Sequence, residues 1–211
     1  MRLRNIKGAK EQIAASPYVI QNPAEHKGSW NNFFKNDNPI HIEIGMGKGK
    51  FIHELAQMHP EINYIGIERY QSVLIRALSK RAEFEGNNLF FLCEDARNLT
   101  EYFDDSEVAR IYLNFSDPWP KDRHAKRRLT SSGFLSIYNE ILASDGRLEF
   151  KTDNISLFDF SLEELPASGW NLDYVNRNIH ENGPATDNVM TEYEEKFYGL
   201  GNPIQKLIAT R

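Results

Sequence analysis

The stretch that decides the fold is residues 40–58, IHIEIGMGKGKFIHELAQM. Its first five residues are mostly apolar and rich in isoleucine, which predicts a buried strand. Its second half predicts a helix that ends before Pro60, because apolar side chains recur at helical spacing at Phe51, Ile52, Leu55 and Ala56. The two elements are joined by a turn with three glycines, Gly45, Gly47 and Gly49. A strand, a glycine turn and a helix in this order indicate an α/β fold.

The same alternation continues toward the C-terminus. Further strands are predicted at 63–68, 89–93, 109–115 and 147–152. Helices are predicted at 71–85, at 133–143 (closed by the turn SDG) and around 155–165. Residues 170–179 and 205–211 are expected to pair as a closing hairpin. Strands alternating with short helices predict a parallel sheet with helices on both faces. We expect residues 1–37 to form a basic N-terminal arm and residues 38–211 to form the α/β domain.

Composition excludes several classes of protein. The 211 residues suffice for one sizeable domain, and no apolar run is long enough to span a membrane. The basic start is not followed by an apolar signal core, so no secretion is expected. The single cysteine, Cys93, excludes an intramolecular disulfide and fits a cytoplasmic protein. The six histidines show no metal-ligand spacing, so no metal is predicted.

The charge of the chain is distributed unevenly. Residues 1–10 and residues 121–128 each carry +4, whereas the whole chain carries −5, so the remaining residues carry −13. This distribution can place a cationic face on an acidic body, and a polyanion such as a nucleic acid responds to the local face. Two unrelated, solvated charge runs are the alternative.

Acidic side chains stand at the ends of four predicted strands, at Glu43, Glu68, Asp95 and Asp117. In parallel α/β sheets, ligands bind at the carboxyl ends of the strands. Any one of these acids fits a solvated loop, but four in register favour a binding site. Glu68 follows Gly45 by 23 positions, close to the separation of about 20 at which an acid reaches ribose hydroxyls.

These acids favour S-adenosylmethionine over a dinucleotide. Glu43 would repel a pyrophosphate at the first turn, and Lys50 stands where the dinucleotide fingerprint has its third glycine. S-adenosylmethionine instead offers a cationic amino-acid end to Glu43, ribose hydroxyls to Glu68 and an adenine amino group to Asp95. Gly45 and Gly47 would allow this cofactor to approach the backbone closely.

The turn DPWP, residues 117–120, combines a carboxylate with a rigid aromatic. Its two prolines fix the backbone beside Asp117 and Trp119, which suits a base held by stacking and by hydrogen bonds to its edge. Guanine offers a carboxylate two donors, and its N7 carries no proton to remove. Methyl transfer to N7 therefore needs in-line positioning more than a strong base. The cationic stretch that follows suits phosphates.

Taken together, the motifs EIGMGKG, IGIE, CEDA, NFSDPWPKDRHAKRRL, FKTDN and TEYEEKF resemble the bacterial tRNA (guanine-N7-)-methyltransferase family. The resemblance extends from around Ile40 to the C-terminus. It implies a Rossmann-like class I methyltransferase fold with a seven-stranded, mostly parallel sheet and a C-terminal antiparallel strand. It also implies that S-adenosylmethionine methylates N7 of a guanine in the variable loop of tRNA.

The matching motifs further imply roles for single residues. Asp117 is implied to be the active-site residue, and the implied cofactor contacts are Glu43, Glu68, Asp95 and Asp117. The implied substrate contacts are Lys121, Asp153, Thr191, Glu192, Tyr193 and Glu194. The implied RNA-binding segment contains Arg123, His124, Lys126, Arg127 and Arg128. Spacing alone would predict only a surface acidic patch for TEYE, within a loop region.

Three other functions remain open from the sequence. DPWP distantly resembles the turn of enzymes that methylate adenine or cytosine amino groups. An RNA-binding protein with a vestigial crevice would share the cationic segment. A nicotinamide-dependent dehydrogenase is disfavoured by Glu43 and Lys50. The sequence does not distinguish a monomer from a homodimer.

Overall fold

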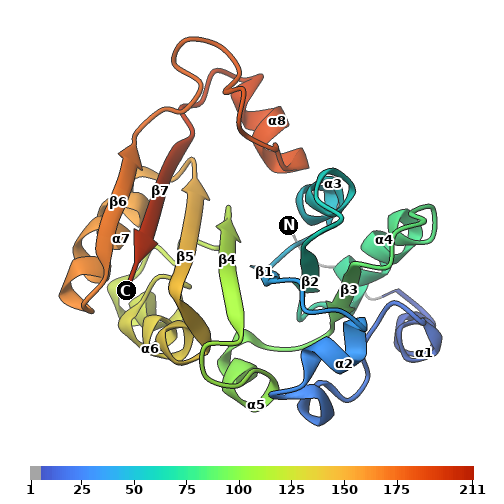
Figure 1. The fold of residues 1–211 in the computed structure, drawn as a ribbon. Coiled ribbons are helices and arrows are strands. Elements are labelled where there is room, and N and C mark those ends of the chain that lie inside the picture. Colours follow the sequence, from blue (N-terminus) through green and yellow to red (C-terminus); the bar gives the residue numbers. More distant parts are fainter. Residues whose placement is uncertain (1–5) are drawn as a thin grey trace.

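A computed structural model describes residues 6–211 and shows one seven-stranded sheet in the order β3-β2-β1-β4-β5-β7-β6 (Figure 1). Neighbours from β3 to β5 are parallel, and β7 runs antiparallel to both β5 and β6. The strands are β1 Ile40–Ile44, β2 Asn63–Ile67, β3 Leu89–Leu92, β4 Val108–Asn114, β5 Leu142–Thr152, β6 Asn171–Asn176 and β7 Gln205–Thr210. The predicted parallel sheet with a closing antiparallel pair is confirmed.

Helices pack on both faces of the sheet and form two apolar clusters. One cluster joins α1, α3 and α4 to the sheet, and the other joins α2, α5, α6 and α7 to the opposite face. The α-helices are α1 Ala9–Ala15, α2 Trp30–Phe34, α3 Lys50–Met58, α4 Gln71–Arg81, α5 Leu99–Tyr102, α6 Ser132–Ile141, α7 Ile155–Ala167 and α8 Glu192–Tyr198. Short 3-10 helices are η1 Pro23–His26, η2 Ala96–Asn98 and η3 Asp122–Arg127. Within residues 6–211, no helix is both long and apolar enough to cross a membrane.

Helix α4 ends at Arg81, four residues earlier than predicted. The guanidinium of Arg81 is buried and donates to the carbonyls of Phe84, Gly86 and Leu89, at 2.7 to 2.8 Å. These bonds satisfy the backbone that follows the helix and turn it toward β3. Residues 82–85, which the sequence assigns to the end of this helix, therefore form a loop rather than a further helical turn.

Strand β5 begins at Leu142, where the sequence predicts the last turn of a helix and a turn SDG. Leu142 is fully buried and pairs with Val108, while Arg110 pairs with Arg147. The register therefore shifts between these pairs, and the SDG residues lie within an irregular part of the strand. A Cβ on Gly146 would lie 2.7 Å from Cγ of Leu142, so glycine permits this close approach.

The N-terminal segment packs against the domain more closely than an arm would. Val19 forms a parallel bridge with Phe91 of β3, and the buried Trp30 stacks on Phe103 with ring centroids 5.2 Å apart. Ile13 and Phe34 also belong to the apolar clusters. Part of the predicted basic stretch, residues 1–5, lies outside the described residues.

Candidate functional site

The carboxyl ends of the parallel strands meet at one edge of the sheet, as predicted. Ile44 of β1 pairs with Ile67 of β2 on one side and with Leu113 of β4 on the other. Ile67 in turn pairs with Leu92 of β3. The residues after each strand therefore lie side by side, and Asn114 of β4 pairs with Lys151 of β5 at the same level. This edge is where the acidic side chains gather.

The glycine turn after β1 leaves open space beside its backbone. Gly45, Gly47 and Gly49 have φ values of 74°, 60° and 74°, a region that other L-residues rarely adopt. A Cβ placed on Gly45 or Gly47 would meet nothing within 4 Å. The backbone N–H of Gly45 donates to the carbonyl of Ile67 at 2.8 Å, which fixes the turn to β2. The turn can therefore admit a ligand close to the main chain.

Glu43 is a buried acid with unused bonding capacity. Its side chain is 2% exposed, and its Oε1 accepts a hydrogen bond of 2.9 Å from Nδ2 of Asn114. Among the described residues, no donor reaches its Oε2. Burial raises the pKa of the Glu43 carboxyl to about 8. A cationic ligand group could use this oxygen and would favour the ionised form.

Glu68 is held at the neighbouring strand end by backbone donors. Its Oε1 accepts from the N–H of Tyr70 at 2.9 Å, and its Oε2 accepts from the N–H of Gly47 at 3.3 Å. Burial raises the pKa of Glu68 above its usual range. The contact to Gly47 ties Glu68 to the glycine turn, so these two predicted cofactor residues share one site.

Asp95 lies after β3 and pairs with Arg97. Nε and Nη2 of Arg97 donate to the two oxygens of Asp95 at 3.0 and 2.8 Å, and the Arg97 N–H also donates at 3.0 Å. The Arg97 side chain lowers the pKa of Asp95. Asp95 is therefore an ionised acceptor with lone pairs left for another donor.

The segment from Phe115 to Trp119 is strained at both ends. These residues have φ values of 52° and 42°, which are uncommon for residues with a Cβ. The N–H of Phe115 donates to the carbonyl of Lys151 at 2.8 Å, and this bond ties the segment to β5. Asp117 lies between the strained residues and is exposed. The turn therefore presents Asp117 to solvent on a constrained backbone.

Arg128 holds this turn in place. Its guanidinium donates to the carbonyls of Pro118 and Trp119, at 3.2 and 3.1 Å, and lies 4.4 Å from the ring centre of Phe160. Arg128 is buried, which differs from its predicted role as an RNA contact. The geometry shows a clamp on DPWP in place of an exposed phosphate ligand.

The rest of the cationic segment is available to a ligand. Lys121, Arg123, Lys126 and Arg127 are exposed, and His124 is half-buried. The guanidinium of Arg127 lies 4.8 Å from the ring centre of Trp119, and His124 meets the same ring edge-on at 5.8 Å. Two residues of η3, His124 and Arg127, thus contact the aromatic side chain of the DPWP turn.

Residues 191–194 begin helix α8, where the sequence predicts a loop (Figure 1). Thr191 caps the helix, because its Oγ1 accepts from the N–H of Glu194 at 2.9 Å. Tyr193 is exposed and packs against Phe115 with the two rings tilted and their centroids 4.9 Å apart, and its hydroxyl donates to Oδ2 of Asp153 at 3.3 Å. Tyr193 and Asp153 therefore lie together beside the segment that carries Asp117. Glu192 forms an ion pair with Lys80 of α4.

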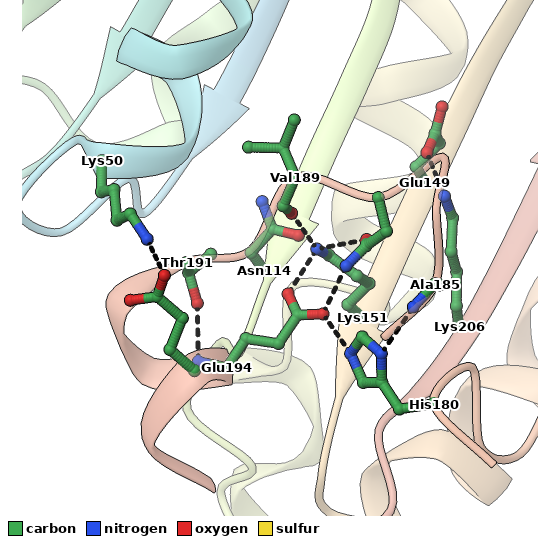
Figure 2. A network of polar contacts seen from close by, with 12 residues as sticks. Lys50, Asn114, Glu149, Lys151, His180, Ala185, Val189, Thr191, Glu194 and Lys206 are labelled. Carbon is green, nitrogen blue, oxygen red and sulfur yellow. Dashed lines mark hydrogen bonds and ion pairs between the residues drawn. The ribbon is translucent and has the colours of Figure 1, made fainter. Parts of the chain in front are cut away.

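Glu194 is fully buried. Its carboxylate pairs with Lys151, as Figure 2 shows. No sequence motif predicts a role for Lys151, His180 or Asn114, although all three contribute to this edge. Lys151 and Asn114 had one available signal, since each is a polar residue at the end of an apolar strand. His180 lies in an irregular segment and had none.

Among the described residues, no group of three or more His, Cys, Asp or Glu side chains has the arrangement of a metal site. The site is instead built from single carboxylates, backbone donors and aromatic rings. This donor set fits a cationic nucleoside ligand better than a metal ion.

Solved structures similar to this chain are methyltransferases. The 16S rRNA methyltransferase KamB aligns with a TM-score of 0.65 at 13% identity, over 87% of this chain and 92% of that chain. The 16S rRNA (adenine(1408)-N(1))-methyltransferase of Catenulisporales acidiphilia, a mutant solved with the cosubstrate SAM, gives a TM-score of 0.62 at 15% identity, over 90% of this chain and 92% of that chain. These likenesses show the class I methyltransferase fold.

The sequence comparisons identify the family. The family model described as "Putative methyltransferase" matches residues 37–207. The tRNA (guanine-N(7)-)-methyltransferase of Lachnoclostridium phytofermentans is 59% identical over 100% of this chain and 99% of its own length. That of Bacillus subtilis is 50% identical over 98% of this chain and 97% of its own length. The chain therefore belongs to the tRNA (guanine-N(7)-)-methyltransferase family.

Proposed function

We propose that this protein transfers the methyl group of S-adenosylmethionine to N7 of a guanine in tRNA, in the variable loop, within the cytoplasm. One observation carries the choice of cofactor: Glu43 is buried at the end of β1 with an oxygen that no described residue bonds. A carboxylate in this state suits the ammonium end of the cofactor. When bound, the cofactor supplies an electrophilic methyl group on a sulfonium sulfur.

The other residues of the edge fit the remaining parts of this cofactor. Glu68 stands beside the glycine turn, where it can accept from ribose hydroxyls, and Asp95 can accept from an adenine amino group. The open space at Gly45 and Gly47 allows close approach to the backbone.

The tRNA is proposed to enter from the side of the DPWP turn. Asp117 would accept hydrogen bonds from the guanine edge and favour the positive charge that develops on the purine. Lys121, Asp153, Thr191, Glu192 and Tyr193 would position the nucleotide, and the contact of Tyr193 with Asp153 beside Phe115 supports this role for those two residues. The exposed Arg123, Lys126 and Arg127, with His124, would contact phosphates without reading sequence.

Labelled methyl transfer tests this function. The purified protein is incubated with bulk tRNA and tritiated S-adenosylmethionine, and the tRNA is then digested to nucleosides. We expect label only in N7-methylguanosine, and strand scission by borohydride and aniline at one position. Label in an amino-methylated adenosine or cytidine would favour the alternative enzyme class. Absence of heat on titrating the cofactor into the protein would favour an RNA-binding protein.

A further inference from the structure

Helix α8 bridges the two sides of the ligand edge. Glu195 pairs with Lys50 at the start of α3, and Glu192 pairs with Lys80 of α4. On the other side of the helix, Glu194 pairs with Lys151 of β5 at 2.6 Å. The two outer pairs are partly exposed, whereas the side chains of Lys151 and Glu194 are 4% and 0% exposed. The buried pair is therefore the anchor of α8.

Every hydrogen-bonding proton of the Lys151 ammonium has a partner (Figure 2). Nζ donates to Oε2 of Glu194, to Oδ1 of Asn188 at 3.0 Å and to the carbonyl of Val189 at 2.9 Å. All three acceptors lie within residues 188–194, so one nitrogen of Lys151 bonds three points of a single segment. A buried ammonium bonded in this way fixes its partners strongly.

The second oxygen of Glu194 is also fully used. Its Oε1 accepts from Nδ2 of Asn188 at 2.7 Å and meets Nε2 of His180 at 2.9 Å. Nδ1 of His180 accepts from the N–H of Ala185 at 3.1 Å, which leaves the ring proton on Nε2. Nε2 of His180 therefore donates to Glu194. The carboxylate has no oxygen free for a substrate.

This anchor lies against the reacting region. Lys151 pairs with Asn114, the partner of Glu43, and its carbonyl accepts from Phe115. Tyr193 precedes Glu194 and contacts both Phe115 and Asp153. Tyr193 packs against Phe115, and Asp117 follows Phe115 by two residues. Any shift of Glu194 would therefore move its neighbour Tyr193 relative to Asp117.

We propose that Lys151, Asn188 and His180 are positioning residues for methyl transfer, which act through Glu194 to hold α8 and Tyr193 against the base-binding turn. The proposal rests on the proposed function for the identity of the reaction. It assigns Glu194 to the support of the site, whereas the preceding residue, Tyr193, contacts the nucleotide. A small misplacement of a positioning group suffices to slow a reaction that depends on alignment.

The test compares two variants with a matched control. Glu194→Gln removes the charge of the carboxylate and keeps its shape. The double variant Lys151→Met with Glu194→Gln avoids leaving a lone buried ammonium or carboxylate and keeps the test valid if a single variant unfolds. Arg177→Met is the control. Arg177 lies in the same segment between β6 and α8 as His180 and Asn188, and it forms an exposed ion pair with Asp159 that the substitution removes.

Three quantities are measured for each folded variant: the Kd for S-adenosylmethionine, kcat and KM for tRNA methylation, and amide hydrogen exchange of residues 192–198. In the double variant we expect kcat to fall by about 10- to 100-fold while the cofactor Kd changes less than about threefold. The α8 amides should exchange at least about tenfold faster. Arg177→Met should match the wild type in all three.

The proposal is overturned if the double variant keeps the wild-type kcat, or if kcat falls while the α8 amides stay protected. An equal loss in Arg177→Met would also overturn it, since the loss of any ion pair made by this part of the chain would then explain the effect. Amide exchange is measured on the protein without tRNA, so it does not depend on which base is methylated. A wild-type protein that methylates no tRNA would instead refute the proposed function.

Discussion

The side-chain amide of Asn114 donates a 2.9 Å hydrogen bond to Oε1 of Glu43 and leaves the other oxygen of that carboxyl without a described partner. This contact joins the ends of β1 and β4, the point at which the strand order reverses direction. Such points are where ligands bind in open α/β sheets. Glu43 is therefore fixed in place by one oxygen and available to a ligand through the other.

Cofactor binding should release a proton near neutral pH. Burial raises the pKa of Glu43 to about 8, so its carboxyl is mostly protonated in the free protein at pH 6.5. The cationic end of the cofactor favours the ionised carboxylate, and about one proton should leave on binding. Calorimetric titrations at pH 6.5 in two buffers of different ionisation enthalpy measure this release. Equal heats in both buffers would contradict the assignment of Glu43.

Glu43→Gln should stabilise the free protein in alkaline solution and weaken cofactor binding. The pKa of Glu43 is raised from 4.5 in the unfolded chain to about 8 in the fold. The folded state therefore binds the extra proton, and stability from this group falls as pH rises from 4.5 toward 8. The neutral amide escapes this loss, which amounts to a few kcal/mol at most.

Denaturant unfolding at pH 5 and pH 9 measures the difference. We expect the variant to gain stability over the wild type at pH 9 and much less at pH 5. Asn114→Ala serves as the comparison, because it removes the partner of Glu43 and keeps the titrating carboxyl. A gain of equal size at both pH values in Glu43→Gln would show that ionisation is not its cause.

The strand ends could be predicted from sequence because the information is local. Apolar runs punctuated by glycines and prolines indicate the strands, and parallel pairing then brings their carboxyl ends to one edge. Glu43, Glu68 and Asp95 follow from that rule. The pairing of Leu142 with Val108 could not be predicted, because nothing near Leu142 in the sequence indicates which strand it meets.

The buried ion pair of Lys151 and Glu194 that anchors α8 could not be predicted from local sequence patterns, for the same reason. Glu194 stands between two acids of TEYEEK that are at least partly exposed, and its partners Lys151 and His180 are 43 and 14 residues away. Spacing therefore indicates a solvated acidic patch. Burial of Arg128 was likewise invisible within a run of basic residues, because its acceptors are backbone carbonyls.

Asp117→Asn should abolish turnover while leaving tRNA affinity nearly intact. Asp117 is exposed and lies on a strained turn, so the substitution should not disturb the fold. The amide cannot favour positive charge on the purine, and we expect kcat to fall about 100-fold or more. Single-turnover methylation and filter binding to tRNA measure the two effects. A variant with full activity would remove Asp117 from the chemistry.

Arg127→Gln and Arg128→Gln should separate RNA contact from support of the turn. Arg127 is exposed beside Trp119, so its loss should weaken binding to many RNAs alike and reduce the salt slope of log affinity by about 1. Arg128 is buried and donates to two carbonyls of DPWP, so its loss should destabilise the fold by about 1–3 kcal/mol. The salt dependence of RNA binding by Arg128→Gln should match that of the wild type.

Salt-dependent binding and thermal unfolding of both variants decide between these roles. The two substitutions remove the same side chain from adjacent positions, so each is the matched control for the other. Arg128 would be a phosphate ligand if its loss lowered the salt slope and left the melting temperature unchanged. Arg127 would be part of the clamp if its loss lowered the melting temperature as much as that of Arg128. We expect neither of these two outcomes, because of the two arginines only Arg128 is buried and donates to the carbonyls of Pro118 and Trp119.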